Sequence, residues 1–239
     1  MMSAATSEAD FRYSALQYAI APNQVQFVQL ILTYTTEAEG TLNSRNPAYK
    51  TDELSPRTWG DFERLFRKPG EWGNCQCVWF HREGPRPEIE LRLTSKERNE
   101  RNFLLQKELV TRGRSHGVLM YLEGDPIGWC QYGPRGEFPR IEKGAKYRGI
   151  PPADANENLW RITCFCVDKK FRNRGVAKAG LHAALDSIRR GGGGIVEAYP
   201  TTRRKGLALH RGTIAMFKEE GFREVMALGP ANLVVRRAI

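Results

Sequence analysis

The order of apolar and helix-like segments along the 239-residue chain predicts a mixed α/β fold, with helices flanking a central sheet. Residues 159–167 (LWRITCFCV) form an apolar run with little alternation, which is typical of a central strand buried on both faces. Residues 175–190 carry apolar side chains at helical spacing, and four consecutive glycines follow them. Strand-like and helix-like segments alternate from residue 75 to the C-terminus, so we expect one layered domain.

The first 58 residues are expected to be a helical N-terminal extension that packs on the main domain of residues 59–239. Apolar side chains at helical spacing predict a helix at residues 25–39. Residues 43–56 are polar and turn-rich, and we expect a loop there. Residues 59–68 predict a short amphipathic helix that a Pro-Gly pair ends.

The middle of the chain predicts a β-hairpin. Its strands are residues 118–122 and 127–132, and the Glu-Gly-Asp-Pro turn between them supplies a positive φ at glycine and a fixed φ at proline. Residues 75–81 (CQCVWFH) predict a strand by their β-branched and aromatic content, and residues 95–112 predict a helix. Residues 133–157 are rich in glycine, proline and basic residues, so we expect a long functional loop.

The C-terminal part predicts four further elements after the helix at 175–190. They are a strand at 195–199, a helix at 207–220 stopped by a glycine, and a hairpin-like pair of strands at 222–228 and 233–237.

The composition and the charge restrict the possible classes of protein. Hydrophobic residues make up 41% and aromatic residues 10%, which excludes wholesale disorder. The formal net charge is +10, of which residues 1–120 carry +1 and residues 121–239 carry +9. The second half is therefore expected to meet an anionic partner.

The sequence also predicts a compartment. No apolar run reaches the length of a membrane span, and residues 1–10 lack the pattern of a secretory signal. The five cysteines are an odd number in a long chain, which favours reduced thiols in the cytoplasm. We expect a cytoplasmic protein without membrane association.

The most informative motif follows the central strand, at residues 168–178 (DKKFRNRGVAK). A short basic loop with a net charge of +4 leads into a helix that begins at Gly175. Unpaired N–H groups and the positive end of the helix dipole favour an anion at such a junction, and glycine allows a ligand to approach the backbone. The motif lacks the features of a P-loop and of a Rossmann fingerprint, so we expect a phosphate or pyrophosphate of another kind.

Arg172-x-x-Gly175-x-Ala177 resembles the acyl-CoA pyrophosphate loop of the GNAT family of N-acetyltransferases. Residues 210–222 (HRGTIAMFKEEGF) resemble that family's helix ending in a Gly-Phe strand start. The resemblance covers about residues 59–239. Within the family, the sequence is similar to an uncharacterised bacterial and archaeal branch, whose strands carry Cys-x-Cys-aromatic, Gly-Trp-Cys and Val-Glu-x-Tyr-Pro motifs. It implies a GNAT-like central mixed, mostly antiparallel sheet flanked by helices.

The resemblance also implies the function, which is transfer of an acetyl group from acetyl-CoA directly to an amine, without a metal. The backbone of Cys166 and Val167 would pair with the pantetheine arm and polarise the thioester. The N–H groups of residues 172–177 would hold the pyrophosphate. The implied cofactor-binding residues are Cys166, Val167, Arg172, Asn173, Arg174, Gly175, Val176, Ala177, His210 and Phe217.

The sequence departs from the family at the catalytic acid and at one usual base. Phe217 stands where a tyrosine often protonates the thiolate, His210 replaces an asparagine, and Arg161 stands where histone-acetylating members have glutamate. The remaining candidates for acid–base catalysis are Glu197, Tyr199 and Glu157, with His210 as a further option.

Two other functions stay open at this point. A GNAT fold without catalysis could bind acyl-CoA as a sensor or scaffold, and the loss of tyrosine at Phe217 keeps that reading open. A nucleic-acid-binding module would need a stripe of basic and aromatic residues, whereas the positive charge concentrates at one loop, so nucleic acid is disfavoured. Residues 1–58 could cover the acceptor side, form a homodimer interface or pack as an extra layer.

The cysteines form two Cys-x-Cys pairs, Cys75/Cys77 and Cys164/Cys166. A four-thiolate zinc site is one interpretation, but zinc ligands are usually spaced on a turn rather than along a strand. The spacing favours buried free thiols, and we expect no bound metal.

Overall fold

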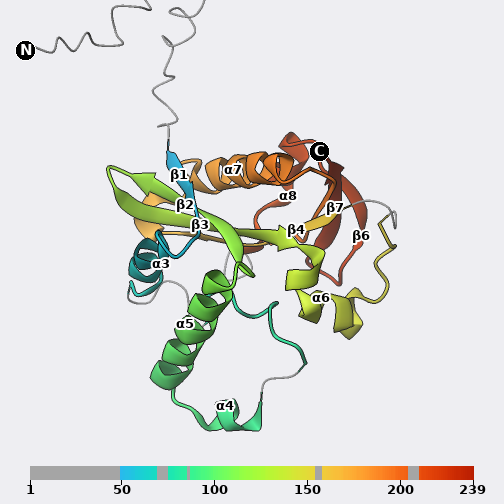
Figure 1. The fold of residues 1–239 in the computed structure, drawn as a ribbon. Coiled ribbons are helices and arrows are strands. Elements are labelled where there is room, and N and C mark those ends of the chain that lie inside the picture. Colours follow the sequence, from blue (N-terminus) through green and yellow to red (C-terminus); the bar gives the residue numbers. More distant parts are fainter. Residues whose placement is uncertain (1–48, 69–74, 85–86, 154–157, 204–209) are drawn as a thin grey trace, which may run out of the picture. The chain divides into compact units, whose positions relative to one another are not determined.

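The computed structural model describes residues 49–68, 75–84, 87–153, 158–203 and 210–239 (Figure 1). Tyr49–Ile239 forms one compact unit built around a seven-stranded sheet with the order β1-β2-β3-β4-β5-β7-β6. The strands are β1 (Lys50–Glu53), β2 (His116–Leu122), β3 (Asp125–Pro134), β4 (Leu159–Val167), β5 (Ile195–Ala198), β6 (Arg223–Ala227) and β7 (Leu233–Ala238).

The sheet is antiparallel except between β4 and β5. The parallel pair needs a crossover, and helix α7 (Val176–Arg190) supplies it. The structure therefore confirms a mixed, mostly antiparallel sheet with residues 159–167 as its central strand.

Helix α7 packs on one face of the sheet, against β2, β3 and β4 (Figure 1). Its buried stripe includes Leu181, Leu185 and Ile188. Gly180 brings the helix close to the sheet, because a Cβ at this position would lie 2.8 Å from the Met120 methyl carbon. The apolar period of the sequence thus matches the face that the helix buries.

Helices α3 (Trp59–Phe66) and α5 (Ser95–Thr111) lie on the opposite side, where α3 packs on β3 and α5 packs on α3 (Figure 1). Trp129 of β3 is fully buried there, with its ring 5.0 Å from that of Phe62. Thr94 caps α5 through a reciprocal capping box with Glu97. Alternate residues of β2 thus serve two cores, one beneath α7 and one beneath α3.

Short helical segments complete the described chain. They are α4 (Glu88–Arg92), η1 (Arg135–Glu137), α6 (Pro139–Lys143), η2 (Ala145–Tyr147), η3 (Lys169–Phe171) and α8 (Ile214–Glu219). No described helix has the length and apolar character needed to cross a membrane.

Three local expectations need correction. Residues 75–81 form turns rather than a strand, with positive φ at Gln76 and Cys77. Residues 43–56 are not all loop, because Lys50–Glu53 pairs with β2 as an edge strand. This strand of the main sheet lies before residue 58, the expected boundary of the N-terminal extension. Residues 133–157 are not one long loop over their described part, because they form the short helical segments η1, α6 and η2. These segments depend on local hydrogen-bonded turns that the composition does not reveal.

Other predicted elements are confirmed. The hairpin of β2 and β3, the helix α7 and the closing pair of β6 and β7 all lie where the pattern predicts them. The helix expected at 207–220 is described only from residue 210, and α8 begins at Ile214, capped by Thr213. The helix expected at residues 25–39 lies outside the described residues.

Candidate functional site

The candidate site is a cleft that opens where β4 and β5 part. Among the described residues, β5 pairs with residues 159–162 of β4, whereas residues 163–167 pair only with β3. Pro200 follows β5 and has no N–H to continue the ladder. A cleft of about 1720 Å³ borders the unpaired half of β4, and Phe165, Cys166 and Val167 line it.

The loop after β4 shapes one end of the cleft. The Asp168 carboxylate accepts a hydrogen bond from the Lys170 N–H at 3.0 Å and so caps the turn η3. Asn173 and Gly175 then take φ values of 60° and 81°, and Gly175 is the N-cap of α7. The loop therefore reverses direction and presents the first turn of α7, whose N–H groups have no intrahelical acceptor, to the cleft.

Basic side chains line the cleft. Lys169, Arg172 and Lys178 come from the loop and the start of α7, and Lys178 pairs with Glu219 at 2.9 Å. The Arg172 guanidinium donates to the Val167 carbonyl at 3.0 Å, which holds the loop against the end of β4. Positive side chains thus accompany the α7 N-terminus at this loop, as an anionic ligand requires. Arg203 and Arg211 also line the cleft, and the Arg211 guanidinium lies 5.9 Å from the Phe80 ring.

The structure brings most of the predicted cofactor-binding residues to this cleft. They are Cys166, Val167, Arg172, Asn173, Gly175, Val176, Ala177 and His210. Their side chains come from β4, the loop, α7 and the segment before α8, so only the folded chain assembles them.

Arg174 and Phe217 are placed elsewhere. The Arg174 carbonyl accepts a hydrogen bond from the Tyr49 hydroxyl at 2.7 Å, and its guanidinium lies 5.8 Å from the Phe171 ring, outside the cleft lining. Phe217 is fully buried against Phe165, with ring centroids 6.0 Å apart. Neither side chain lines the cleft, because the Arg174 guanidinium lies over the Phe171 ring and Phe217 fills the core.

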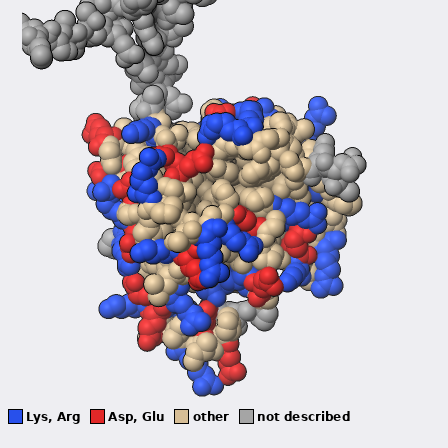
Figure 2. All heavy atoms as spheres, viewed as in Figure 1, with Lys and Arg blue, Asp and Glu red and all other residues tan. Residues whose placement is uncertain are grey.

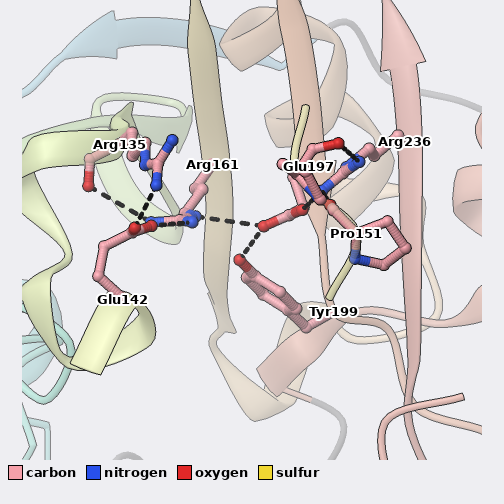
Figure 3. Close-up of polar contacts among 8 residues, drawn as sticks. Arg135, Glu142, Pro151, Arg161, Glu197, Tyr199 and Arg236 are labelled. Carbon is pink, nitrogen blue, oxygen red and sulfur yellow. Dashed lines mark hydrogen bonds and ion pairs between the residues drawn. The ribbon is translucent and has the colours of Figure 1, made fainter. Parts of the chain in front are cut away.

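Glu197 lies in a buried ion network away from the cleft (Figure 3). Its side chain is 1% exposed and accepts from Arg161 at 3.2 Å and from Arg236 at 2.7 Å. Arg161 also pairs with Glu142, and Arg236 donates to the Pro151 carbonyl at 2.6 Å. The structure therefore places Glu197 in a buried ion network and not on the lining of the cleft, and its two oxygens accept from Arg161, Arg236 and Tyr199.

Tyr199 belongs to the same network. Its hydroxyl donates to Glu197, its ring is 2% exposed, and burial raises the pKa of the phenol well above its ordinary value (Figure 3). Like Glu197, it does not line the cleft. Glu157, the third catalytic candidate, lies outside the described residues.

The sequence interpretation weighed a four-thiolate site and disfavoured it, and the structure places a cluster of three thiols on the cleft wall. Cys77, Cys164 and Cys166 all line the cleft, and their sulfur atoms lie within 4.8 Å of one another. Gln131 and Thr163 line the same region. The two Cys-x-Cys pairs were the available signal, but the strand expected at 75–81 obscured the turn that brings Cys77 to β4.

The sheet order, the parting of β4 and β5, and the glycine loop at the start of α7 together define a mixed α/β acetyltransferase-like fold. The model of the acetyltransferase (GNAT) family matches residues 79–222. The chain belongs to the GNAT family of acetyltransferases.

Solved structures of low similarity are among the matches. One is an acetyltransferase of the GNAT family from Desulfovibrio desulfuricans, with 17% identity and a TM-score of 0.45 over 80% of this chain and 99% of that one. Another is the PaiA N-acetyltransferase from Thermoplasma acidophilum in complex with coenzyme A, with 10% identity and a TM-score of 0.45 over 80% and 99% of the chains. No curated protein matches the sequence.

Proposed function

We propose that the protein is an acetyl-CoA-dependent N-acetyltransferase that transfers the acetyl group directly to the amine of a small molecule, peptide or protein. The observation that carries the proposal is the joint placement of the unpaired half of β4 and the Gly175 loop on one cleft. The first supplies strand-edge hydrogen bonds, and the second supplies an anion site. Pantetheine and pyrophosphate are the two parts of coenzyme A that need these features.

The residues have separate roles. The backbone of Cys166 and Val167 would pair with the amides of the pantetheine arm, and the N–H groups of residues 172–177 would hold the pyrophosphate. Lys169 and Arg172 would neutralise phosphate charge from the cleft wall. A backbone N–H near Val167 would polarise the thioester carbonyl as negative charge develops on its oxygen.

The acceptor amine would attack the thioester carbon, the C–S bond would break, and the amine would lose one proton while the thiolate gains one. We assign His210 as the group that accepts the amine proton, directly or through water, because it lines the cleft and imidazole is the commonest general base. The family's usual tyrosine is Phe217, which is buried, so water would protonate the thiolate.

Calorimetry with acetyl-CoA tests the cofactor part of the proposal, with duplex and single-stranded DNA as competing ligands. We expect micromolar binding of acetyl-CoA and weaker binding of DNA. Absence of acetyl-CoA binding would exclude both the enzyme and a non-catalytic acyl-CoA sensor, and tight DNA binding instead would favour a nucleic-acid-binding module.

Thiol release from acetyl-CoA across a panel of amines then separates an enzyme from a sensor. We expect His210→Gln to lower kcat by about 10²-fold with little change in acetyl-CoA affinity, the magnitude for loss of a general base. Binding without turnover on any amine would favour the sensor. Unchanged kcat in His210→Gln would contradict the assignment of the base.

The proposal extends to the setting of the reaction. All five cysteines are free, which supports a reducing compartment, and we place the protein in the cytoplasm without membrane association. We assign residues 59–239, together with residues 49–58 that belong to the same compact unit, to the transferase domain. We assign the residues before them to an extension that covers the acceptor side or mediates homodimer formation. Analytical ultracentrifugation of the whole chain tests the dimer.

A further inference from the structure

Three thiols from two distant parts of the chain meet on the wall of the cleft. Cys164 and Cys166 are alternate residues of β4 and point to the same face of the sheet, with sulfur atoms 3.9 Å apart. Cys77 reaches them from the turns at residues 75–81, and all three sulfur atoms lie within 4.8 Å of one another. The third thiol is therefore contributed by tertiary structure and not by strand spacing.

The backbone of Cys77 is held in a disfavoured conformation. Gln76 and Cys77 have φ values of 44° and 59°, in the left-handed region that residues with a Cβ seldom adopt. The Gln131 side chain donates to the Cys77 carbonyl at 2.8 Å, and the Thr163 hydroxyl donates to the Gln131 side-chain oxygen at 2.8 Å. Neighbouring strands β3 and β4 thus fix the position of Cys77 through a buried polar chain.

The spacing of the sulfur atoms suits a metal ion. Bonds of about 2.3 Å from a tetrahedral zinc ion to its thiolates place the sulfur atoms about 3.8 Å apart. Cys164 and Cys166 are already at 3.9 Å, and Cys77 needs no more than a small side-chain adjustment to complete the set. Cys75 lines the same cleft but lies outside this group of three.

The cluster is open to the cleft, because all three cysteines line it. Metal binding requires ionised thiols and releases their protons. Cys130 gives the contrast, because it is buried in the apolar core beneath α7 and lies outside the group of three. Cys130 is an ordinary buried cysteine, whereas the three cleft thiols form a cluster.

We propose that Cys77, Cys164 and Cys166 bind one thiophilic metal ion of the zinc type, with the fourth coordination position open toward the cleft. Three protein ligands and one open position are the arrangement of zinc sites that take water or a substrate group as the fourth ligand. The three residues line the same cleft as the Gly175 loop, so an acceptor group in the cleft could reach the ion. The inference concerns metal uptake and does not depend on acetyl transfer.

Cobalt titration of the full-length, reduced, chelator-treated protein tests the site without any activity assay. Cobalt(II) is the spectroscopic probe, because thiolate coordination gives charge-transfer absorption and tetrahedral geometry gives intense visible bands. We expect saturation at one equivalent and displacement of cobalt by one equivalent of zinc. Absence of these bands, or uptake that does not saturate at one equivalent, would overturn the proposal.

Single serine variants then identify the ligands. Cys77→Ser and Cys164→Ser are expected to lower zinc affinity at least 10- to 100-fold, since even the loss of an outer partner of a ligand has an effect of that size. Cys130→Ser is the matched control, because it removes a buried sheet cysteine outside the cluster and should bind like the natural chain. Circular dichroism checks that each variant is folded.

The outcomes are distinct. Loss in both cluster variants and retention in Cys130→Ser would support the proposal. Equal affinity in all variants, or oxidation of two cluster thiols to a disulfide with no zinc uptake after reduction, would overturn it. Acetyl-CoA calorimetry on the same metal-free protein reports the cofactor cleft separately, so failure of the metal site and failure of the proposed function are distinguishable.

Discussion

At the scale of single residues, the same residue type can serve the fold or the chemistry, and its neighbours decide which. An acid in an apolar central strand is typical of a catalytic group, and Glu197 fits that pattern in the sequence. Its partners Arg161 and Arg236 come from β4 and β7, at least 36 residues away along the chain, and no local pattern reveals them. The loop residue Gly175, in contrast, could be predicted, because its role depends on its immediate neighbours.

Glu197→Gln is expected to lower the free energy of unfolding by about 3 kcal/mol, because two buried guanidinium groups lose their shared counter-charge. Urea denaturation measures this change. The control is Glu88→Gln, whose carboxylate is 79% exposed and pairs with Arg92, and which should change stability by no more than about 0.5 kcal/mol. Unchanged stability together with lost turnover would restore Glu197 as a catalytic residue.

Gly175→Ala is expected to weaken acetyl-CoA binding about fivefold or more, because a Cβ at a φ of 81° costs about 1 kcal/mol and shifts the loop. Calorimetry measures the affinity. Gly124→Ala is the matched control, since Gly124 has a φ of 85° in the turn between β2 and β3 and does not line the cleft. Equal loss of affinity in both variants would show that a Cβ at a positive φ weakens binding through the stability of the whole fold and not through the loop that would hold the pyrophosphate.

At the scale of elements, long periodic segments could be predicted and short or polar ones could not. Helix α7 shows its helical apolar period directly, and strand β4 is a largely apolar run of nine residues, typical of a strand buried on both faces. Residues 75–81 have the composition of a strand, yet they find no strand partner among the described residues and turn at Gln76 and Cys77. Strand β1 is the opposite case, because its four residues, KTDE, are polar and pair with β2 at an edge.

The segment at 75–81 also predicts a pH dependence through His81. Burial lowers the pKa of its imidazole to about 4, whereas an unfolded histidine titrates near 6.5. Protons therefore bind the unfolded chain first as the pH falls below about 6.5, and the stability that His81 contributes above this pH is lost toward pH 4. We expect a loss of about 2 kcal/mol between pH 7 and pH 5 from this residue.

Urea denaturation at the two pH values measures that loss. His81→Gln should remove about this much of the pH dependence, because glutamine does not titrate. His182→Gln is the comparison, since the side chain of His182 is 49% exposed and pairs with Glu220 on the surface, so its removal should leave the loss attributed to His81 in place. The same pH dependence in all three proteins would contradict the role of His81.

At the scale of the whole molecule, part of the net charge of +10 is concentrated in one segment. A net +4 falls on residues 168–178, which form one end of the cleft. On the face seen in Figure 2, basic and acidic side chains are interspersed and form no continuous basic stripe. This distribution favours a small anionic cofactor over a nucleic-acid backbone.

Salt dependence tests this distribution. We expect the affinity for acetyl-CoA to fall several-fold between 0.05 and 0.5 M NaCl, roughly the range over which the Debye length shrinks from about 14 to 4 Å. Acetyl-pantetheine is the matched ligand, because it keeps the thioester and the amides but has no phosphates, and its affinity should not change. Equal salt dependence for both ligands would show that the basic loop does not contact the phosphates.

The parting of β4 from β5 has a consequence for aggregation. Ordinary sheets expose their unsatisfied edges at the periphery, and here those edges are short and charged: KTDE in β1 and an Arg-Glu start in β6. The apolar, uncapped edge is instead internal, at residues 163–167. A foreign extended chain would have to enter the cleft to pair with it, which is the path that pantetheine would take. A ligand bound in the cleft would thus block strand addition at this edge, and the protein would aggregate most readily without the ligand.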